Sequence, residues 1–301
     1  MKPIADVVEP AQALPELFTH AQADLAGLRP ERPHGRPITR ITRDVYTLRQ
    51  PVDYPLRVRA ACLALGSDSI VHGVTALRLR GVDLPRRLQE DERVHVLRTK
   101  RTFPAMRDDI CSHRDRLQVG PEALGGLWVT TAAEAWLQIA NQVSIDALVH
   151  VGDALMRREH ALSRLSDLTA LVEHSHRRPG IRKARAALLL CREGTDSWPE
   201  TTVRLLLVRG GLPCPTVNLP ITDETGRIVY YLDMAYPAQR VAVEYDGRYH
   251  VDDATRVRDL SRRRWLEDRS WRLVSVAAPD LRDPAGIVAS VRLALSSDAR
   301  S

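Results

Sequence analysis

The stretch IVYYLDMAYPAQRVAVEYDGRYHVDDATRVRDLSRRRWLEDRSWRLVSV, residues 228–276, decides the predicted fold. Its apolar segments at 228–234 and 239–247 favour two strands joined by the short link AYPA. The arginine-rich segment at 253–269 favours a helix, and WRLVSV at 271–276 favours a third strand. Strands and a helix in this order predict a small mixed α/β sheet flanked by helices.

The segments on either side of this stretch extend the same domain. Pro199 and Glu200 suit the first turn of a helix, because proline is tolerated there and a carboxylate faces the positive end of the helix dipole. TDETG at 222–226 is typical of a hairpin turn, and Asp283 favours the start of a C-terminal helix. We therefore predict a domain over residues 196–301, separate from residues 1–195.

The strand VAVEYDG alternates apolar and acidic side chains. With a period of two, Val241, Val243 and Tyr245 share one face, while Glu244 and Asp246 share the other. Two carboxylates on one face repel each other unless a cation or a proton lies between them. The pattern therefore indicates a cation site on this face.

Asp233, on the preceding strand, offers a third carboxylate. Mg²⁺ prefers a few carboxylates together with water and substrate phosphate, so Asp233, Glu244 and Asp246 predict a site for Mg²⁺ or Mn²⁺. An ion held there would activate water for phosphodiester hydrolysis. The alternatives are a strand-end cap for Asp233, a turn at Asp246–Gly247 and a solvated strand face.

The same residues carry a resemblance to a known family. Residues 196–281 resemble the DUF559 family of the PD-(D/E)xK nuclease superfamily, which is similar to the very short patch repair endonucleases. The matching positions are Glu200, the segment GLPCP at 211–215, Asp233, the segment VEYDGRYH at 243–250, and the spaced set Asp259, Arg262, Leu266 and Trp271. Ser270 stands where the family usually has glycine.

The resemblance implies a metal-dependent DNA endonuclease. Asp246 stands where the superfamily has its lysine, so His250 is the candidate base or metal ligand in its place. The alternative for His250 is a hydrogen bond to a neighbouring carboxylate. Arg262 would offset charge in the transition state. Glu200 and Asp259 would not bind the metal themselves but would position the residues that do. The predicted catalytic residues are thus Glu244, Asp246, His250 and Arg262.

Basic residues predict a phosphate-binding surface. The net charge is +6, and only three of the 44 basic residues are lysine. Arginine pairs with phosphate through a planar fork, and Arg256 and Arg263 lie two turns apart on the predicted helix, where they could follow a nucleic-acid backbone. A solvated helix face is the alternative, and a GC-rich genome would also explain the scarcity of lysine.

Residues 1–195 are expected to form a mostly helical α+β domain. IVHGVTALRLRG at 70–81 and VTTAAEAWLQIA at 129–140 resemble segments of actinobacterial proteins similar to AbiEi antitoxins, over roughly residues 35–175. That resemblance implies a DNA-binding, regulatory role. His72, in the first segment, is interpreted as a structural contact. The widely spaced cysteines argue against a zinc site or disulfides and favour buried thiols; they are Cys62, Cys111, Cys191 and Cys214.

The sequence thus predicts a cytoplasmic, metal-dependent DNA endonuclease. The N-terminus carries Asp6 and Glu9 where a secretory signal would be basic and apolar, and no apolar run approaches the roughly 18 residues of a membrane span. DNA is the expected partner, no membrane is expected, and a toxin or other protein partner stays open. The alternative is a non-catalytic DNA-binding regulator or antitoxin-like protein with a degenerate nuclease fold, and RNA remains open as a substrate.

Overall fold

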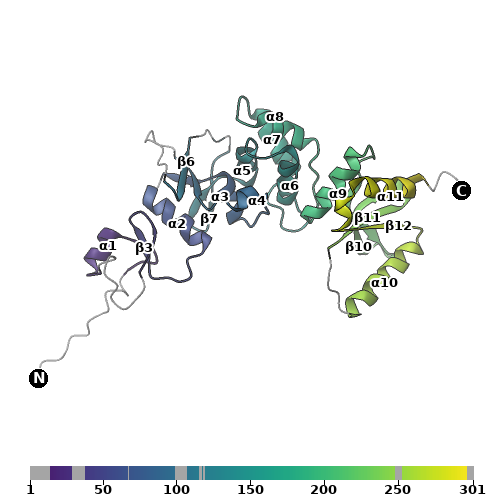
Figure 1. Cartoon of the computed structure of the whole chain (residues 1–301), viewed down its shortest axis with the longest axis horizontal. Coiled ribbons are helices and arrows are strands. Elements are labelled where there is room, and N and C mark those ends of the chain that lie inside the picture. Colours follow the sequence, from purple (N-terminus) through teal and green to yellow (C-terminus); the bar gives the residue numbers. More distant parts are fainter. Residues whose placement is uncertain are drawn as a thin grey trace, which may run out of the picture. The chain divides into compact units, whose positions relative to one another are not determined.

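The computed structural model describes residues 14–28, 38–66, 68–98, 107–114, 117, 119–247 and 253–296, of which 253–259 by their backbone alone. The chain divides into two compact units, Met1–Gln138 and Ile139–Ser301. In Figure 1 the first unit runs from purple to teal, and the second continues through green to yellow. The predicted division between residues 195 and 196 lies inside the second unit.

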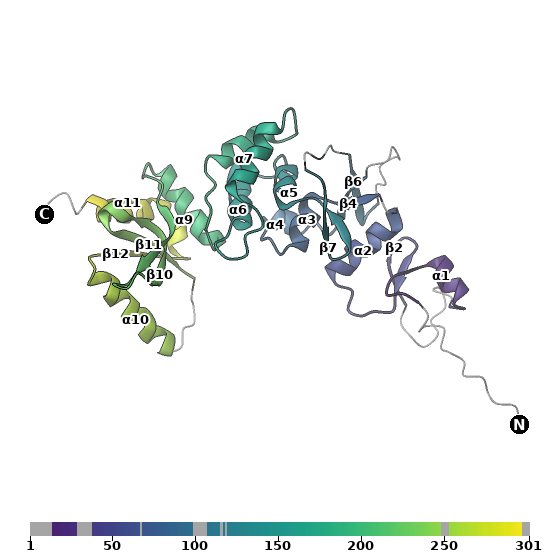
Figure 2. The same ribbon diagram turned by 180° about the vertical axis from the view of Figure 1, so that it is seen from behind.

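The first unit combines helices with two small sheets, seen from behind in Figure 2. One sheet has the order β1-β3-β2, and the other has the order β6-β5-β4-β8-β7. The elements are β1 (Phe18–Thr19), α1 (His20–Leu25), β2 (Thr39–Thr42), β3 (Val45–Thr47), α2 (Tyr54–Leu65), β4 (Ser69–Val71), α3 (Gly73–Leu79), α4 (Arg86–Gln89), β5 (Val94–Arg98), β6 (Ile110–His113), β7 (Glu122–Leu124), β8 (Leu127–Val129) and α5 (Ala132–Ile139).

Local signals set most of these bounds. The Asp53 carboxylate accepts the N–H of Leu56 at 2.8 Å and caps α2, which ends at Gly66 with φ 100°. Strands β2 and β3 pair antiparallel and form a hairpin. Asp44 adopts φ 66° between the two strands, and a short polar side chain tolerates the left-handed conformation that a tight turn needs.

The second unit begins with helices and continues into a four-stranded sheet. Ser144 and Ser197 cap α6 and α9 by accepting N–H groups of the first turn. The elements are α6 (Ile145–Leu155), α7 (Leu165–His174), α8 (Ile181–Leu188), α9 (Trp198–Arg209), β9 (Thr216–Thr222), β10 (Ile228–Tyr236), η2 (Pro237–Gln239), β11 (Val241–Asp246), α10 (Asp253–Glu267), β12 (Arg272–Ala277), η3 (Asp280–Arg282) and α11 (Pro284–Ser296).

The sheet has the order β12-β11-β10-β9 and is mixed. Strands β9, β10 and β11 pair antiparallel, whereas β11 and β12 pair parallel. Parallel neighbours need a crossover connection, and α10 lies in that connection. The predicted α/β class, with a mixed sheet flanked by helices, is confirmed.

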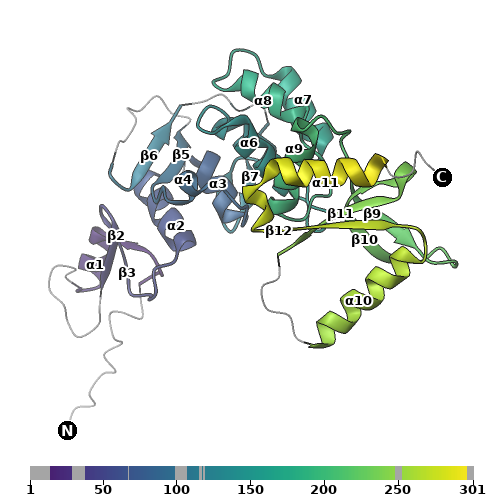
Figure 3. The same cartoon turned by 45° about the vertical axis from the view of Figure 1, so that its right-hand side comes forward.

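Each face of this sheet is covered by different helices, as Figure 3 shows for α10 and α11. Val203 and Leu207 of α9 and Val291 of α11 pack with Val241 and Val243 in one apolar cluster. A second cluster contains Leu266 of α10, and Trp265 packs against it. Close packing of these side chains holds α9, α10 and α11 against the sheet, and so positions Glu200 of α9 and Arg262 of α10.

No helix in the described part of the chain is both long enough and apolar enough to span a bilayer.

Candidate active site

Strand β11 separates apolar from acidic side chains as its alternation predicts. Val241 and Val243 are fully buried against α9 and α11, and Tyr245 packs beside them. Ala242 lies in the cluster on the α10 side. Glu244 points the same way and reaches α10, where it meets Arg262.

Arg262 holds Glu244 by a two-point ion pair. Its Nη1 donates to Oε2 at 3.0 Å and its Nη2 donates to Oε1 at 2.5 Å. Nη2 also donates to the carbonyl oxygen of Tyr231 at 2.9 Å. The two side chains are 27% and 15% exposed, so the pair is shielded from most of the solvent. The resemblance implies that Arg262 stabilises charge in a transition state. In this structure, however, the positive charge of Arg262 is already paired with the Glu244 carboxylate.

Asp233 lies on β10, next to the backbone of β11. Its Oδ2 accepts the N–H of Tyr245 at 3.0 Å. Burial raises the pKa of the Asp233 carboxyl, and the negative charge of Asp196 adds to this, while the Tyr245 N–H and the charge of Arg262 act in the opposite direction. The carboxylate thus stands in surroundings that disfavour its negative charge.

Glu200 occupies the third position of α9 and is 9% exposed. Its Oε1 accepts the Ser197 hydroxyl at 2.7 Å, and its Oε2 accepts the N–H of Asp196 at 3.0 Å. The Ser197 hydroxyl oxygen in turn accepts the N–H of Glu200 at 3.4 Å and so caps α9. Burial raises the pKa of Glu200, the Ser197 hydroxyl lowers it, and the charge of Asp233 raises it again. The negative charge of Asp233 therefore disfavours ionisation of Glu200.

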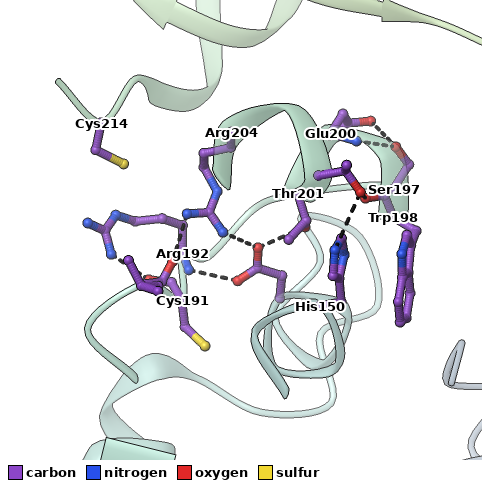
Figure 4. Close-up of polar contacts among 12 residues, drawn as sticks. His150, Cys191, Arg192, Ser197, Trp198, Glu200, Thr201, Arg204 and Cys214 are labelled. Carbon is purple, nitrogen blue, oxygen red and sulfur yellow. Dashed lines mark hydrogen bonds and ion pairs between the residues drawn. The ribbon is translucent and has the colours of Figure 1, made fainter. Parts of the chain in front are cut away.

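Helix α9, which carries Glu200, is anchored by a buried charge network. Arg204 Nη2 pairs with Asp153 Oδ2 of α6 at 2.5 Å, and both side chains are 1% exposed. The Thr201 hydroxyl donates to the same oxygen at 2.8 Å, and the N–H of Arg192 donates to Oδ1 at 2.8 Å. Figure 4 shows Arg204 and Thr201 directed to one side of α9, with Glu200 and Ser197 nearer its start. The network fixes the rotation of α9.

The stacked pair His150 and Trp198 lies beside this network (Figure 4). Their ring centroids are 4.2 Å apart with an interplanar angle of 3°. Burial lowers the pKa of His150 to about 4, so the ring is neutral at physiological pH. Neither the pair nor the Asp153–Arg204 network was foreseen in the sequence, because their members come from distant helices.

Of the remaining predicted site residues, Asp246 and Arg263 are the two whose side chains the structure describes. Asp246 is exposed at the end of β11. His250 lies outside the described residues, and the side chains of Arg256 and Asp259 are not described. Arg263 is exposed and donates to Glu267 of its own helix at 3.0 Å. Asp233, Glu244 and Asp246 hence do not stand as a closed set of three ligands.

The first unit contains a separate cluster of histidines and a cysteine, which belongs to none of the predicted sites. His72 was interpreted as a structural contact and Cys111 as a buried thiol, yet the first unit brings both close to His95 and His113. All four cysteines are free, and Cys191 alone among them is buried, so burial was predicted wrongly for the others. The available signal was the alternation in ICSH, which puts Cys111 and His113 on one strand face.

Comparison with known proteins finds relatives over most of the chain. No family model matches it, and no solved structure matches it. Two proteins of Mycobacterium tuberculosis are each 25% identical over 258 residues, which covers 84% of this chain and 90% of the relative. They are named "Uncharacterized protein MT2308" (strain CDC 1551 / Oshkosh) and "Uncharacterized protein Rv2248" (strain ATCC 25618 / H37Rv). An alignment of this length includes residues of both units.

Proposed function

We propose that this protein is a metal-dependent DNA endonuclease that hydrolyses phosphodiester bonds. One observation carries the proposal: Glu200, Asp233, Glu244 and Arg262 come from four different elements and act on one another by hydrogen bonds or charge. Buried ionisable groups that perturb each other in this way are typical of functional sites. A DNA substrate implies a cytoplasmic location, as the sequence predicts.

The donor set fits Mg²⁺ or Mn²⁺, because all the groups are carboxylates and hard divalent cations prefer oxygen. Asp233 and Glu244 would hold the ion, and Asp246 would join from the exposed end of β11. A cation beside Asp233 would also offset the burial and the charge of Asp196, which raise the pKa of its carboxyl. When bound, the ion would polarise a phosphoryl oxygen and activate a water molecule.

Arg262 has two partners in this proposal, one at a time. Without a cation it satisfies both oxygens of Glu244. Once Glu244 turns to a cation, the guanidinium is released toward the same site. A planar guanidinium pairs well with two phosphate oxygens, so Arg262 would then stabilise the charge that develops on the phosphoryl group. Glu200 would act from the start of α9, where its negative charge and that of Asp233 repel each other and so favour a cation nearby.

The second candidate function is a non-catalytic DNA-binding regulator, with a toxin or another protein as partner. The specific observation in its favour is the Arg262–Glu244 pair itself, since a fully matched carboxylate has no need of a metal. Asp246 in place of the superfamily lysine points the same way. In this case the carboxylates and Arg262 would serve the fold of the second unit alone.

Nicking of supercoiled plasmid by the purified full-length protein tests the proposal. Cleavage is expected with Mg²⁺ or Mn²⁺, none with EDTA, and a loss of at least about 100-fold in Asp233→Asn and Glu244→Gln, the scale of a lost charge-stabilising contact. Glu224→Gln, at a carboxylate that is 94% exposed in the β9–β10 hairpin, is the matched control. Salt-sensitive DNA binding without cutting would favour the regulator. Cleavage of single-stranded RNA in a parallel assay, without cleavage of the plasmid, would indicate RNA as the substrate in place of DNA.

A further inference from the structure

Three neighbouring strands of the first unit place histidine and cysteine side chains on one face. In the parallel pair β5–β6, His95 lies in register with Cys111. His113 follows two residues after Cys111 and therefore shares its face. His72 directly follows β4, and its N–H donates to the carbonyl oxygen of His95 at 3.1 Å. The sheet thus converts positions that are remote in the sequence into one cluster.

The ring and sulfur atoms of this cluster are within reach of a single ion. One ligand atom each from His95, Cys111 and His113 lies within 4.8 Å of the other two. His95 Nδ1 and His113 Nε2 are 2.9 Å apart, and the two rings are stacked with an interplanar angle of 17°. The centroid of the His72 ring is 4.3 Å from that of His113. Such a donor set of two imidazoles and a thiol is typical of zinc sites.

A carboxylate fixes the orientation of His95 from the opposite side of its ring. His95 Nε2 is 3.2 Å from Asp91 Oδ2. Asp91 is in turn held by Arg93, whose Nε and Nη2 donate to its two oxygens at 2.9 and 2.7 Å. The backbone N–H of His95 also donates to the hydroxyl of Thr75 at 2.8 Å. The contact between His95 Nε2 and the Asp91 carboxylate is typical of metal-binding histidines. A hydrogen bond from one ring nitrogen to a carboxylate fixes the tautomer, so that the other ring nitrogen can bind the metal.

We propose that His95, Cys111 and His113 bind a divalent transition-metal ion, Zn²⁺ in the first place, through Nδ1, Sγ and Nε2. The fourth position is open to His72 or to water. Cys111 and His113 are half-buried, which gives the ion a path from solvent, whereas His72 and His95 are each 5% exposed. The site is independent of the proposed nuclease centre, which lies in the second unit and offers only oxygen donors.

The geometry makes a definite demand on the two imidazoles. Two nitrogens bound to one tetrahedral Zn²⁺ at about 2.0–2.1 Å stand roughly 3.3 Å apart. The His95–His113 separation of 2.9 Å is that of a hydrogen bond, so binding replaces the shared proton contact and widens the gap by a few tenths of an ångström. The Cys111 thiol loses its proton to solvent, because the thiolate is the ligand form.

The test uses full-length protein, stripped with a chelator and kept under a reductant that does not bind metal. Zn²⁺ is titrated against a chromophoric chelator, and Co²⁺ is titrated as a spectroscopic substitute. The expected result is one ion per chain with a tetrahedral Co²⁺ spectrum that includes a thiolate charge-transfer band. Cys111→Ser should abolish that band and weaken Zn²⁺ binding at least tenfold. Asp91→Asn should weaken binding about 10–100-fold, as loss of a partner behind a ligand does.

Two matched controls separate this site from the rest of the chain. Cys214→Ser removes an exposed cysteine of the second unit and should leave the Co²⁺ band unchanged. Glu244→Gln removes the proposed nuclease ligand and should leave Zn²⁺ affinity unchanged, so the two metal proposals succeed or fail separately. Should Cys111→Ser fail to fold, alkylation of the native protein gives the answer: Zn²⁺ should protect Cys111 from a maleimide while Cys214 stays reactive. No binding, an undiminished band in folded Cys111→Ser, or equal alkylation of Cys111 with and without Zn²⁺ would overturn the proposal.

Discussion

Arg262 of α10 donates to both carboxylate oxygens of Glu244 on β11, at 3.0 and 2.5 Å. Helix α10 lies in the crossover connection between the parallel strands β11 and β12. The two-point pair therefore links this crossover helix to the strand that carries the predicted metal ligand Glu244. The pair therefore contributes to the stability of the second unit and, in the proposed function, to cation binding by Glu244. These two contributions can be measured separately.

Arg262→Gln should destabilise the protein in the presence of EDTA. The substitution leaves Glu244, which is 15% exposed, without its charged partner, and a lost hydrogen bond to a charged group costs about 1.5–3 kcal/mol. Glu244→Gln combined with Arg262→Gln should recover part of this loss, with a coupling energy of roughly 0.5–3 kcal/mol. Urea unfolding of the four proteins measures the cycle.

Millimolar Mg²⁺ should then stabilise Arg262→Gln more than the native protein, because the cation meets a carboxylate that is no longer neutralised. Arg263→Gln is the control: its pair with Glu267 is exposed, and such pairs contribute about 0–1 kcal/mol. An equal response of all variants to Mg²⁺ would argue that Glu244 holds no cation.

Asp233→Asn should raise the melting temperature at neutral pH without metal, by about 2–4 °C for each kcal/mol gained. The folded pKa of Asp233 lies above its ordinary value of 3.8, chiefly through burial. The ionised form is thus penalised in the folded state, and stability is lost as pH rises through the folded pKa. An asparagine oxygen still accepts the Tyr245 N–H, so the variant keeps the bond and loses the charge.

The same substitution should remove any stabilisation by Mg²⁺, since a ligand is lost. Scanning calorimetry near neutral pH and again below the ordinary carboxyl pKa gives both comparisons, and the gain should vanish at the lower pH. Glu224→Gln should change neither quantity, because that carboxylate is 94% exposed. A melting temperature for Asp233→Asn below that of the native protein would contradict the stated origin of the pKa shift.

Short-range signals made much of the fold predictable. The Asp283 carboxylate accepts the N–H of Gly286 at the start of α11, and Pro199 and Glu200 lie in the first turn of α9, as their positions in the sequence predict. The two predicted strands at 228–234 and 239–247 and the helix predicted at 253–269 likewise correspond to β10, β11 and α10. These features depend on hydrogen bonds within a single turn or on the period of one strand, and such information lies in a few adjacent residues.

Register between strands and the rotation of helices were not predictable in this way. His72 follows β4, His95 lies on β5 and Cys111 lies on β6. Their meeting depends on the antiparallel pairing of β4 with β5 and the parallel pairing of β5 with β6, which no local pattern encodes. The ion pair between Glu244 and Arg262 likewise depends on where α10 crosses the sheet. The chemistry-bearing residues were thus recognised individually at Asp233 and Glu244, while their partners required the tertiary structure.

Two ion pairs between α6 and α9 differ chiefly in burial and should differ in energy. Arg204 pairs with Asp153 where both are 1% exposed, whereas Arg209 pairs with Asp146 where they are 53% and 38% exposed. Arg204→Met strands a buried carboxylate and should cost about 3–5 kcal/mol, while Arg209→Met should cost about 0–1 kcal/mol. Urea unfolding monitored by tryptophan fluorescence provides the comparison.

The double variant Asp153→Leu with Arg204→Met should be more stable than Arg204→Met alone, because no unpaired charge then remains in the interior. Thr201 and the N–H of Arg192 lose a shared acceptor in that variant, so recovery should be partial. Equal losses for Arg204→Met and Arg209→Met would show that burial does not set the strength of these pairs.

His150 should make the second unit acid-sensitive. Its pKa falls from the ordinary 6.5 to about 4 through burial, so as pH drops through this window the unfolded chain binds a proton that the folded chain does not. Stability is therefore complete above pH 6.5 and declines toward pH 4, by roughly 3 kcal/mol at about 1.4 kcal/mol per unit. His150→Phe keeps a ring against Trp198 and removes the proton site, so its unfolding free energy should fall less over the same window. Parallel pH dependences of the two proteins in urea unfolding would place the acid sensitivity at another group.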